Sequence, residues 1–167
     1  MAKTLATVGL DGVINMTESA TGFSRFALVN GLVLERGMVS QLFAESDQTN
    51  KDSPASDLFC ELEQPLVLVV ADRITEVSEL APILEIVKST KRPFFLVSED
   101  LQEEPMSTMV YNNQKNIIQC CAINVPWMAD IQKEMLKDIA TMVGATLVDN
   151  EFGLKLEDVE LKHFGSA

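Results

Sequence analysis

Hydrophobic and polar positions between residues 66 and 123 follow two alternating patterns. Apolar runs at residues 66–70, 94–97 and 117–123 are typical of buried strands. Between these runs, residues 75–89 and 105–113 carry apolar side chains at helical spacing. Alternating strands and helices predict an α/β fold with some parallel pairing at its centre.

The sequence before this region is β-like. Residues 26–34 predict a strand pair broken at the hairpin dipeptide Asn30-Gly31, and residues 58–63 predict a further strand. Residues 44–57 contain almost no apolar side chain and predict a flexible loop.

After this region, residues 130–143 predict a helix that Gly144 ends, and residues 145–149 predict a strand. The length of 167 residues fits one domain with a substantial core. We therefore expect a single α/β domain over residues 1–167, with the flexible loop at about 44–57.

Composition narrows the classes of partner. Lys and Arg number 13 and Asp and Glu number 25, so the net charge is −12. Such a chain repels nucleic-acid phosphates, and its longest apolar run is far shorter than the roughly 20 residues of a membrane helix. Three cysteines (Cys60, Cys120 and Cys121) and one histidine form no metal-ligand motif, and the odd thiol count favours a reducing compartment. We expect a soluble protein with no metal, nucleic-acid partner or membrane partner.

The helix predicted at residues 75–89 carries more apolar surface than docking on one sheet requires. Its apolar side chains cover roughly 220° of the circumference, whereas a surface helix needs a stripe somewhat over ~100° wide. Either the domain buries this helix on two sides, or one edge faces a groove that binds other chains. The side chains are Val77, Leu80, Ala81, Ile83, Leu84, Ile86 and Val87.

The next helix and one earlier segment could complete such a groove. Met106, Met109 and Val110 recur at helical spacing beside Tyr111. Methionine adapts to partners of different shape, although it also fills gaps in ordinary cores. Residues 37–43 are bulky and apolar, and their composition also fits an edge strand.

A second function class rests on carboxylates. Asp72, Glu99 and Asp100 follow predicted strands, where α/β enzymes often place catalytic groups. They could hold Mg²⁺ in a receiver-like phosphoryl-transfer domain, or they could simply occupy turns and cap helices. The sequence contains no phosphate-binding glycine loop and no GxSxG motif. A third possibility is a structural domain with two buried helices.

Several segments together resemble one family. They are DGVINMTESATGF, LVLERGMVSQLF, PLVLVVADRITEVSELAPILEIV, RPFFLVSEDLQEEPMSTMVYNN, CAINVPWMADIQKEMLKDIATMVGAT and FGLKLEDVELKHFG. In this order they resemble the apical domain of group I chaperonins, the GroEL type, over nearly the whole chain. At residues 125–133 the sequence VPWMADIQK stands where the family has APGFGDRRK, with two glycines and two arginines lost.

The resemblance implies a chaperonin apical-domain-like fold of the swivelling β/β/α type, with β-sheets flanked by helices. It implies an apolar groove between two helices that binds non-native polypeptides and the mobile loop of a co-chaperonin. The family's equatorial motif GDGTT is absent. We therefore expect no enzymatic activity and no cofactor in this fragment, whereas the parent would use ATP and Mg²⁺ in a homo-oligomeric ring. The expected location is a mitochondrial or plastid matrix or stroma, or the bacterial cytoplasm.

Carried over by position, the resemblance implies ten residues that bind polypeptide and co-chaperonin. They are Met38, Ser40, Leu42, Phe43, Ala81, Leu84, Met106, Val110, Tyr111 and Asn112.

Overall fold

The chain is described by a computed structural model that divides it into two units, residues 1–34 and 35–167. Of the strand pair predicted at residues 26–34, the structure describes Leu28 and residues 31–34, and none of these lies in a strand. Leu28, Leu32 and Val33 are exposed, so no packed face holds them in a sheet. The described residues are 7–9, 14, 16, 23, 28, 31–34, 36–44, 59–125 and 129–167.

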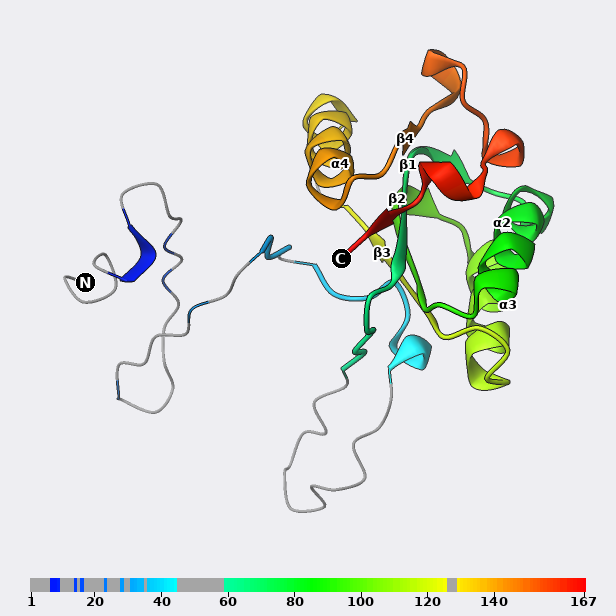
Figure 1. The fold of residues 1–167 in the computed structure, drawn as a ribbon, viewed down its shortest axis with the longest axis horizontal. Coiled ribbons are helices and arrows are strands. Elements are labelled where there is room, and N and C mark those ends of the chain that lie inside the picture. Colours follow the sequence, from blue (N-terminus) through cyan, green and yellow to red (C-terminus); the bar gives the residue numbers. More distant parts are fainter. Residues whose placement is uncertain are drawn as a thin grey trace. The chain divides into compact units, whose positions relative to one another are not determined.

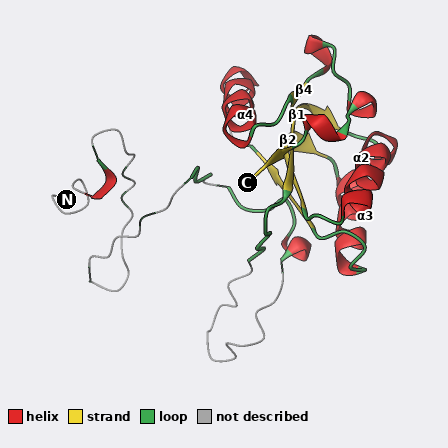
Figure 2. Cartoon of the chain, viewed as in Figure 1, coloured by secondary structure: helices red, strands yellow, loops and turns green. Residues whose placement is uncertain are grey.

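A five-stranded sheet forms the centre of the unit 35–167 (Figure 2). Strand β1 (Leu66–Ile74) pairs in parallel with β2 (Phe94–Leu101) on one side and with β4 (Leu147–Val148) on the other. Strand β3 (Cys120–Asn124) extends the parallel sheet beyond β2. The short β5 (Gly165–Ser166) pairs antiparallel with the start of β1, on the side where β4 also lies.

Helices cover both faces of the sheet (Figure 1). Helices α2 (Val77–Thr90) and α3 (Glu103–Gln114) lie side by side on one face, and α4 (Ala129–Val143) lies on the other. Residues 66–71 of β1 are all buried. A parallel sheet covered on both faces requires such an uninterrupted apolar run, so the α/β prediction is confirmed.

The helix ends have local causes. Helix α2 begins two residues later than predicted because Glu79 accepts hydrogen bonds from the backbone of Thr75 and Glu76, at 3.0 and 3.1 Å. Helix α4 ends at Val143, as predicted, because the next residue, Gly144, has a φ of +69° that suits glycine.

Short 3₁₀ helices connect the remaining described segments. Helix η1 (Gln41–Phe43) precedes the sheet, and η2 (Asn150–Phe152), η3 (Leu156–Asp158) and η4 (Leu161–His163) follow β4. Helix η3 contacts α2, and Leu156 belongs to the same buried core as the inward side chains of α2. The C-terminal segment therefore covers a second side of α2.

Three local predictions are wrong. The turns expected at Asp72 and at residues 99–100 are parts of β1 and β2, because the parallel pairing of these strands continues through Arg73 with Asp100 and Ile74 with Leu101. Arg73 also forms an ion pair with Asp100, 3.1 Å long. The strand expected at residues 58–63 is reduced, within the described residues, to an isolated bridge at position 59. The edge strand considered for residues 37–43 is replaced by η1, whose start Ser40 caps by accepting from the Leu42 backbone at 3.2 Å.

Other predictions are not decided by the structure. The loop predicted at residues 44–57 lies outside the described residues apart from Ala44, and residues 126–128 of the divergent segment are also outside them. The single domain over residues 1–167 stays a prediction. No helix formed by the described residues combines the length and apolarity needed to cross a lipid bilayer.

Candidate functional site

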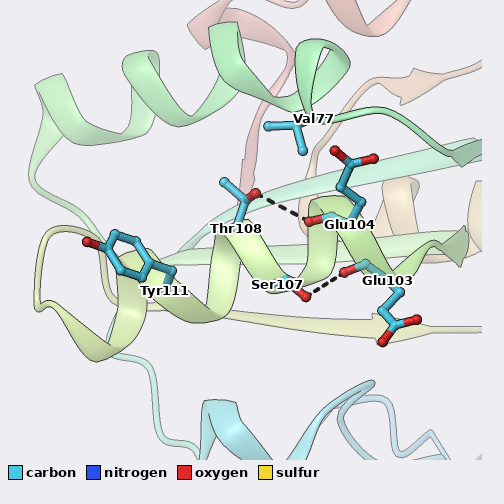
Figure 3. A pocket seen from close by; sticks show the side chains of 6 residues that line it. All are labelled: Val77, Glu103, Glu104, Ser107, Thr108 and Tyr111. Atoms are coloured by element: carbon cyan, nitrogen blue, oxygen red, sulfur yellow. Dashed lines mark hydrogen bonds between the residues drawn. The ribbon is translucent and has the colours of Figure 1, made fainter.

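A shallow groove of about 520 Å³ lies between the first turn of α2 and the outer side of α3 (Figure 3). It opens widely to solvent. Its lining combines two apolar or aromatic side chains with four polar ones, two of them acidic. The lining residues are Val77 from α2 and Glu103, Glu104, Ser107, Thr108 and Tyr111 from α3.

The hydroxyl groups in this groove are already used by the helix. Ser107 donates to the Glu103 carbonyl at 2.7 Å, and Thr108 donates to the Glu104 carbonyl at 3.3 Å (Figure 3). The carboxylates of Glu103 and Glu104, the ring of Tyr111 and the side chain of Val77 are therefore the groups that can meet a ligand.

Three of the ten predicted binding residues are buried in the domain's own core. Leu84 is 8% exposed, Val110 is 6% exposed, and Phe43 is buried as well. The expectation that Leu84 and Val110 stand uncovered between the helices is wrong. The reason is that η3 covers α2 with Leu156, while α3 turns Val110 toward the sheet core. Of the two alternatives stated for the helix predicted at residues 75–89, burial on two sides by its own domain is therefore correct.

The other seven predicted residues reach the surface. Leu42 is 60% exposed, Tyr111 is 58% exposed, and Ala81 is also exposed. The remaining four are half-buried, namely Met38, Ser40, Met106 and Asn112. That these seven residues bind polypeptide stays a prediction.

Two of the predicted polar residues serve the fold. Ser40 caps η1, and the Asn112 side chain donates to the Thr108 carbonyl at 2.8 Å within α3. Their hydrogen-bonding groups are therefore partly engaged before any ligand arrives.

The segment containing η1 packs against α3 and the edge strand β3. The Val39 amide donates to the Ala122 carbonyl at 2.9 Å, and the Asn113 side chain donates to the Phe43 carbonyl at 3.4 Å. This attachment buries Phe43 and leaves Leu42 exposed beside α3. The structure thus brings the η1 segment to α3, as the resemblance implies.

Sequence reasoning missed Glu103 and Glu104 as lining residues and Lys115 as a neighbour of Tyr111. The reason is that two acidic residues directly before the helix predicted at residues 105–113 are expected simply as favourable charges at a helix N-terminus. The Lys115 ammonium lies 5.7 Å from the centroid of the Tyr111 ring, in cation–π range. The helix predicted at residues 105–113 stops two residues before Lys115, so the four-residue spacing of Tyr111 and Lys115 did not indicate this pair.

The carboxylates of the alternative function have structural partners. Asp72 accepts from the Asn150 backbone at 2.7 Å, and Asp100 pairs with Arg73. Across the described ranges, no three His, Cys, Asp or Glu side chains gather closely enough to hold a metal ion. No observation in this part of the chain favours the receiver-like site.

The two strand cysteines, Cys120 and Cys121, are buried. Burial raises the pKa of Cys120 from 9.0 to about 12 and also raises the pKa of Cys121, with a further contribution from Cys60 in both cases. The Cys120 thiol also donates to the Met109 carbonyl at 3.4 Å. Thiols held in the protonated form are poor nucleophiles, so these cysteines serve packing.

Fold and site together define an α/β domain with a solvent-open groove on its paired-helix face. A comparison with known protein families finds no match. Among solved structures, the chain is similar to the chaperonin gp146 from the bacteriophage EL 2 (Pseudomonas aeruginosa), crystallised in the presence of ATP-BeFx. The identity is 17% and the TM-score 0.48, over 64% of this chain and 22% of the phage protein.

Proposed function

We propose that this chain is the polypeptide-binding domain of a chaperonin and has no catalytic activity of its own. The observation that carries the proposal is the exposure of Leu42 and Tyr111 on two elements that pack together, η1 and α3. The sequence resemblance, which covers nearly the whole chain, places both residues among the polypeptide contacts and thereby supports the proposal.

The proposed binding surface is narrower than the sequence predicted. It consists of Leu42, Ala81, Tyr111 and the half-buried Met38 and Met106. The three buried residues of the predicted set belong to the hydrophobic core and are not part of this surface. Unfolded chains have exposed apolar side chains in common, so an adaptable surface with few fixed hydrogen bonds suits them.

One such surface binds weakly. Burying one aliphatic side chain contributes about 1.5–3 kcal/mol, whereas association costs at least ~4 kcal/mol. Several copies presented to one client raise the effective concentration and so the avidity. We therefore propose that the parent protein is a homo-oligomeric ring.

The remaining functional proposals come from the family resemblance. In the parent, an equatorial domain would bind ATP and Mg²⁺, and a co-chaperonin loop would compete with clients for the surface around Tyr111. The parent would act in a mitochondrial or plastid compartment or in the bacterial cytoplasm.

The test is capture of a chemically denatured protein by beads that carry the chain at high density. Replacing Leu42 and Tyr111 together by serine should lower capture at least about threefold, because two apolar contacts are lost. Phe152→Ser is the control, since Phe152 is an apolar side chain that is 77% exposed on η2, outside the proposed surface.

Circular dichroism and thermal unfolding should show both variants folded. Equal loss of capture by the Phe152→Ser control, or full capture by the double variant, would contradict the proposed surface.

A further inference from the structure

The groove beside α3 is electrically polarised along its length. We infer that it selects polypeptide segments with a basic side chain about four residues from a bulky apolar one. The inference rests on the proposed function and names the chemistry of the segment that binds. It goes beyond apolar recognition because the two ends of the groove carry opposite charge.

One end of the groove is negative. Glu103 and Glu104 are exposed in the first turn of α3, and neither carboxylate has a hydrogen bond or ion pair within the described part of the chain. A helix N-terminus carries only about half a positive charge, so two carboxylates leave this end net negative. In Figure 3, the Glu104 side chain points toward Val77 on α2, while Glu103 extends from the other side of the same turn, so apolar contact and negative charge occur together at Glu104.

The other end is aromatic, and the positive charge of Lys115 lies beside it. Tyr111 exposes more than half of its side chain, and the Lys115 ammonium lies 5.7 Å from its ring centroid. A basic side chain of a bound segment would be repelled by Lys115 but attracted by the glutamates. An apolar side chain can pack on Tyr111, so each end favours a different kind of residue.

The separation of the two ends sets the spacing. Glu103 and Tyr111 are eight positions apart on α3, or about 12 Å at 1.5 Å per residue. An extended chain advances about 3.3 Å per residue and covers this distance in about four residues. The segment that fits is therefore extended, with Lys or Arg at one point and Leu, Phe or a similar residue about four positions away.

Labelled peptides binding to the whole chain in solution test the inference by fluorescence anisotropy. Three peptides share a leucine and differ only in the residue four positions from it, which is arginine, glutamine or glutamate. At low salt the arginine peptide should bind about two- to tenfold more tightly than the glutamine peptide, and the glutamate peptide more weakly. High salt should reduce these differences, because exposed charges are screened.

Two double variants separate a local effect from the overall negative charge. Replacing Glu103 and Glu104 by glutamine should abolish the preference for arginine and leave the glutamine peptide within about twofold. The control replaces two exposed carboxylates of α4 on the opposite face of the sheet, Glu134→Gln and Asp138→Asn. It removes the same charge and should leave the preference unchanged.

The outcomes distinguish this inference from the proposed function. Equal affinity for the arginine and glutamine peptides, or an equal effect of both double variants, overturns the inference while apolar binding stands. Binding of none of the three peptides, even by densely displayed chain, overturns the inference together with the proposed function.

Discussion

The side chain of Asn113 donates a hydrogen bond to the carbonyl oxygen of Phe43, 3.4 Å away. The side-chain oxygen Oδ1 of Asn113 accepts a hydrogen bond from the Cys120 backbone amide at 3.1 Å. One residue near the end of α3 therefore connects η1 with the start of β3. The exposed position of Leu42 depends on this connection, because Leu42 lies next to the anchored Phe43.

Replacing Asn113 by alanine should release η1. We expect the free energy of unfolding to fall by about 1–3 kcal/mol, since a partly buried amide group is left unsatisfied. Capture of denatured protein should weaken as Leu42 loses its fixed position. Urea unfolding and the bead assay measure the two effects. Gln114→Ala is the control, because Gln114 is exposed on the same helix. Unchanged stability and capture would show that the Asn113 connection is dispensable.

Leu84 should behave as a core residue. Leu84→Ala is expected to lower the free energy of unfolding by about 2–5 kcal/mol, because it leaves a cavity beneath α2. Ala81→Ser on the exposed side of α2 should change it by less than about 0.5 kcal/mol. Urea denaturation compares the two. A Leu84→Ala variant with unchanged stability but no capture would place Leu84 in an open groove, as the family resemblance implies.

Gly165 is required for close packing of β5. A Cβ atom at this position would collide with the Val143 carbonyl oxygen and lie 2.9 Å from the Ala145 nitrogen. Gly165→Ala should therefore destabilise the domain by about 1–3 kcal/mol. Gly37→Ala, where a Cβ meets nothing within 4 Å, should be neutral. Thermal unfolding of the two variants tests this, and equal melting temperatures would contradict the packing.

The buried thiols make stability depend on alkaline pH. The pKa of Cys120 rises from 9.0 to about 12 on folding, so the folded state retains a proton that the unfolded state loses. The contribution is fully present below about pH 9 and declines as the pH rises toward about 12, by up to about 1.4 kcal/mol per pH unit per thiol.

Urea unfolding at about pH 8 and about pH 10.5 measures this decline. Cys120→Ala should lose less stability over the same interval, because one titrating thiol is absent. An identical loss in both proteins would mean that Cys120 does not contribute.

Local apolar periodicity was sufficient to predict the central strands and helices. The spacing within residues 66–70 or 75–89 is determined by the element's own geometry, so no distant segment is needed to recognise it. The acidic ends of β1 and β2 were missed because Asp is depleted in strands, and the Arg73–Asp100 pair that offsets this forms only across two strands.

The candidate site was harder to predict because exposure depends on distant segments. Nothing within residues 75–89 indicates that η3 covers α2, and this covering decides whether Leu84 meets solvent. Tyr111 could be assigned to the surface only once Met109 and Val110 were known to face the core. Glu103 and Glu104 are visible in the sequence, but acidic side chains are ordinary at a helix N-terminus and do not by themselves indicate a groove.

The position of β1 has a consequence for how the domain folds. β1 pairs with β2, which follows closely in the sequence, but its other side is completed by β4 and β5, which come last. Closing such long loops slows folding, because their entropy must be lost before the contacts form. During synthesis, one side of Leu66 and Val67 therefore stays unpaired until Gly165 has left the ribosome. A nascent chain of this protein therefore exposes an unpaired strand edge that can aggregate before synthesis is complete.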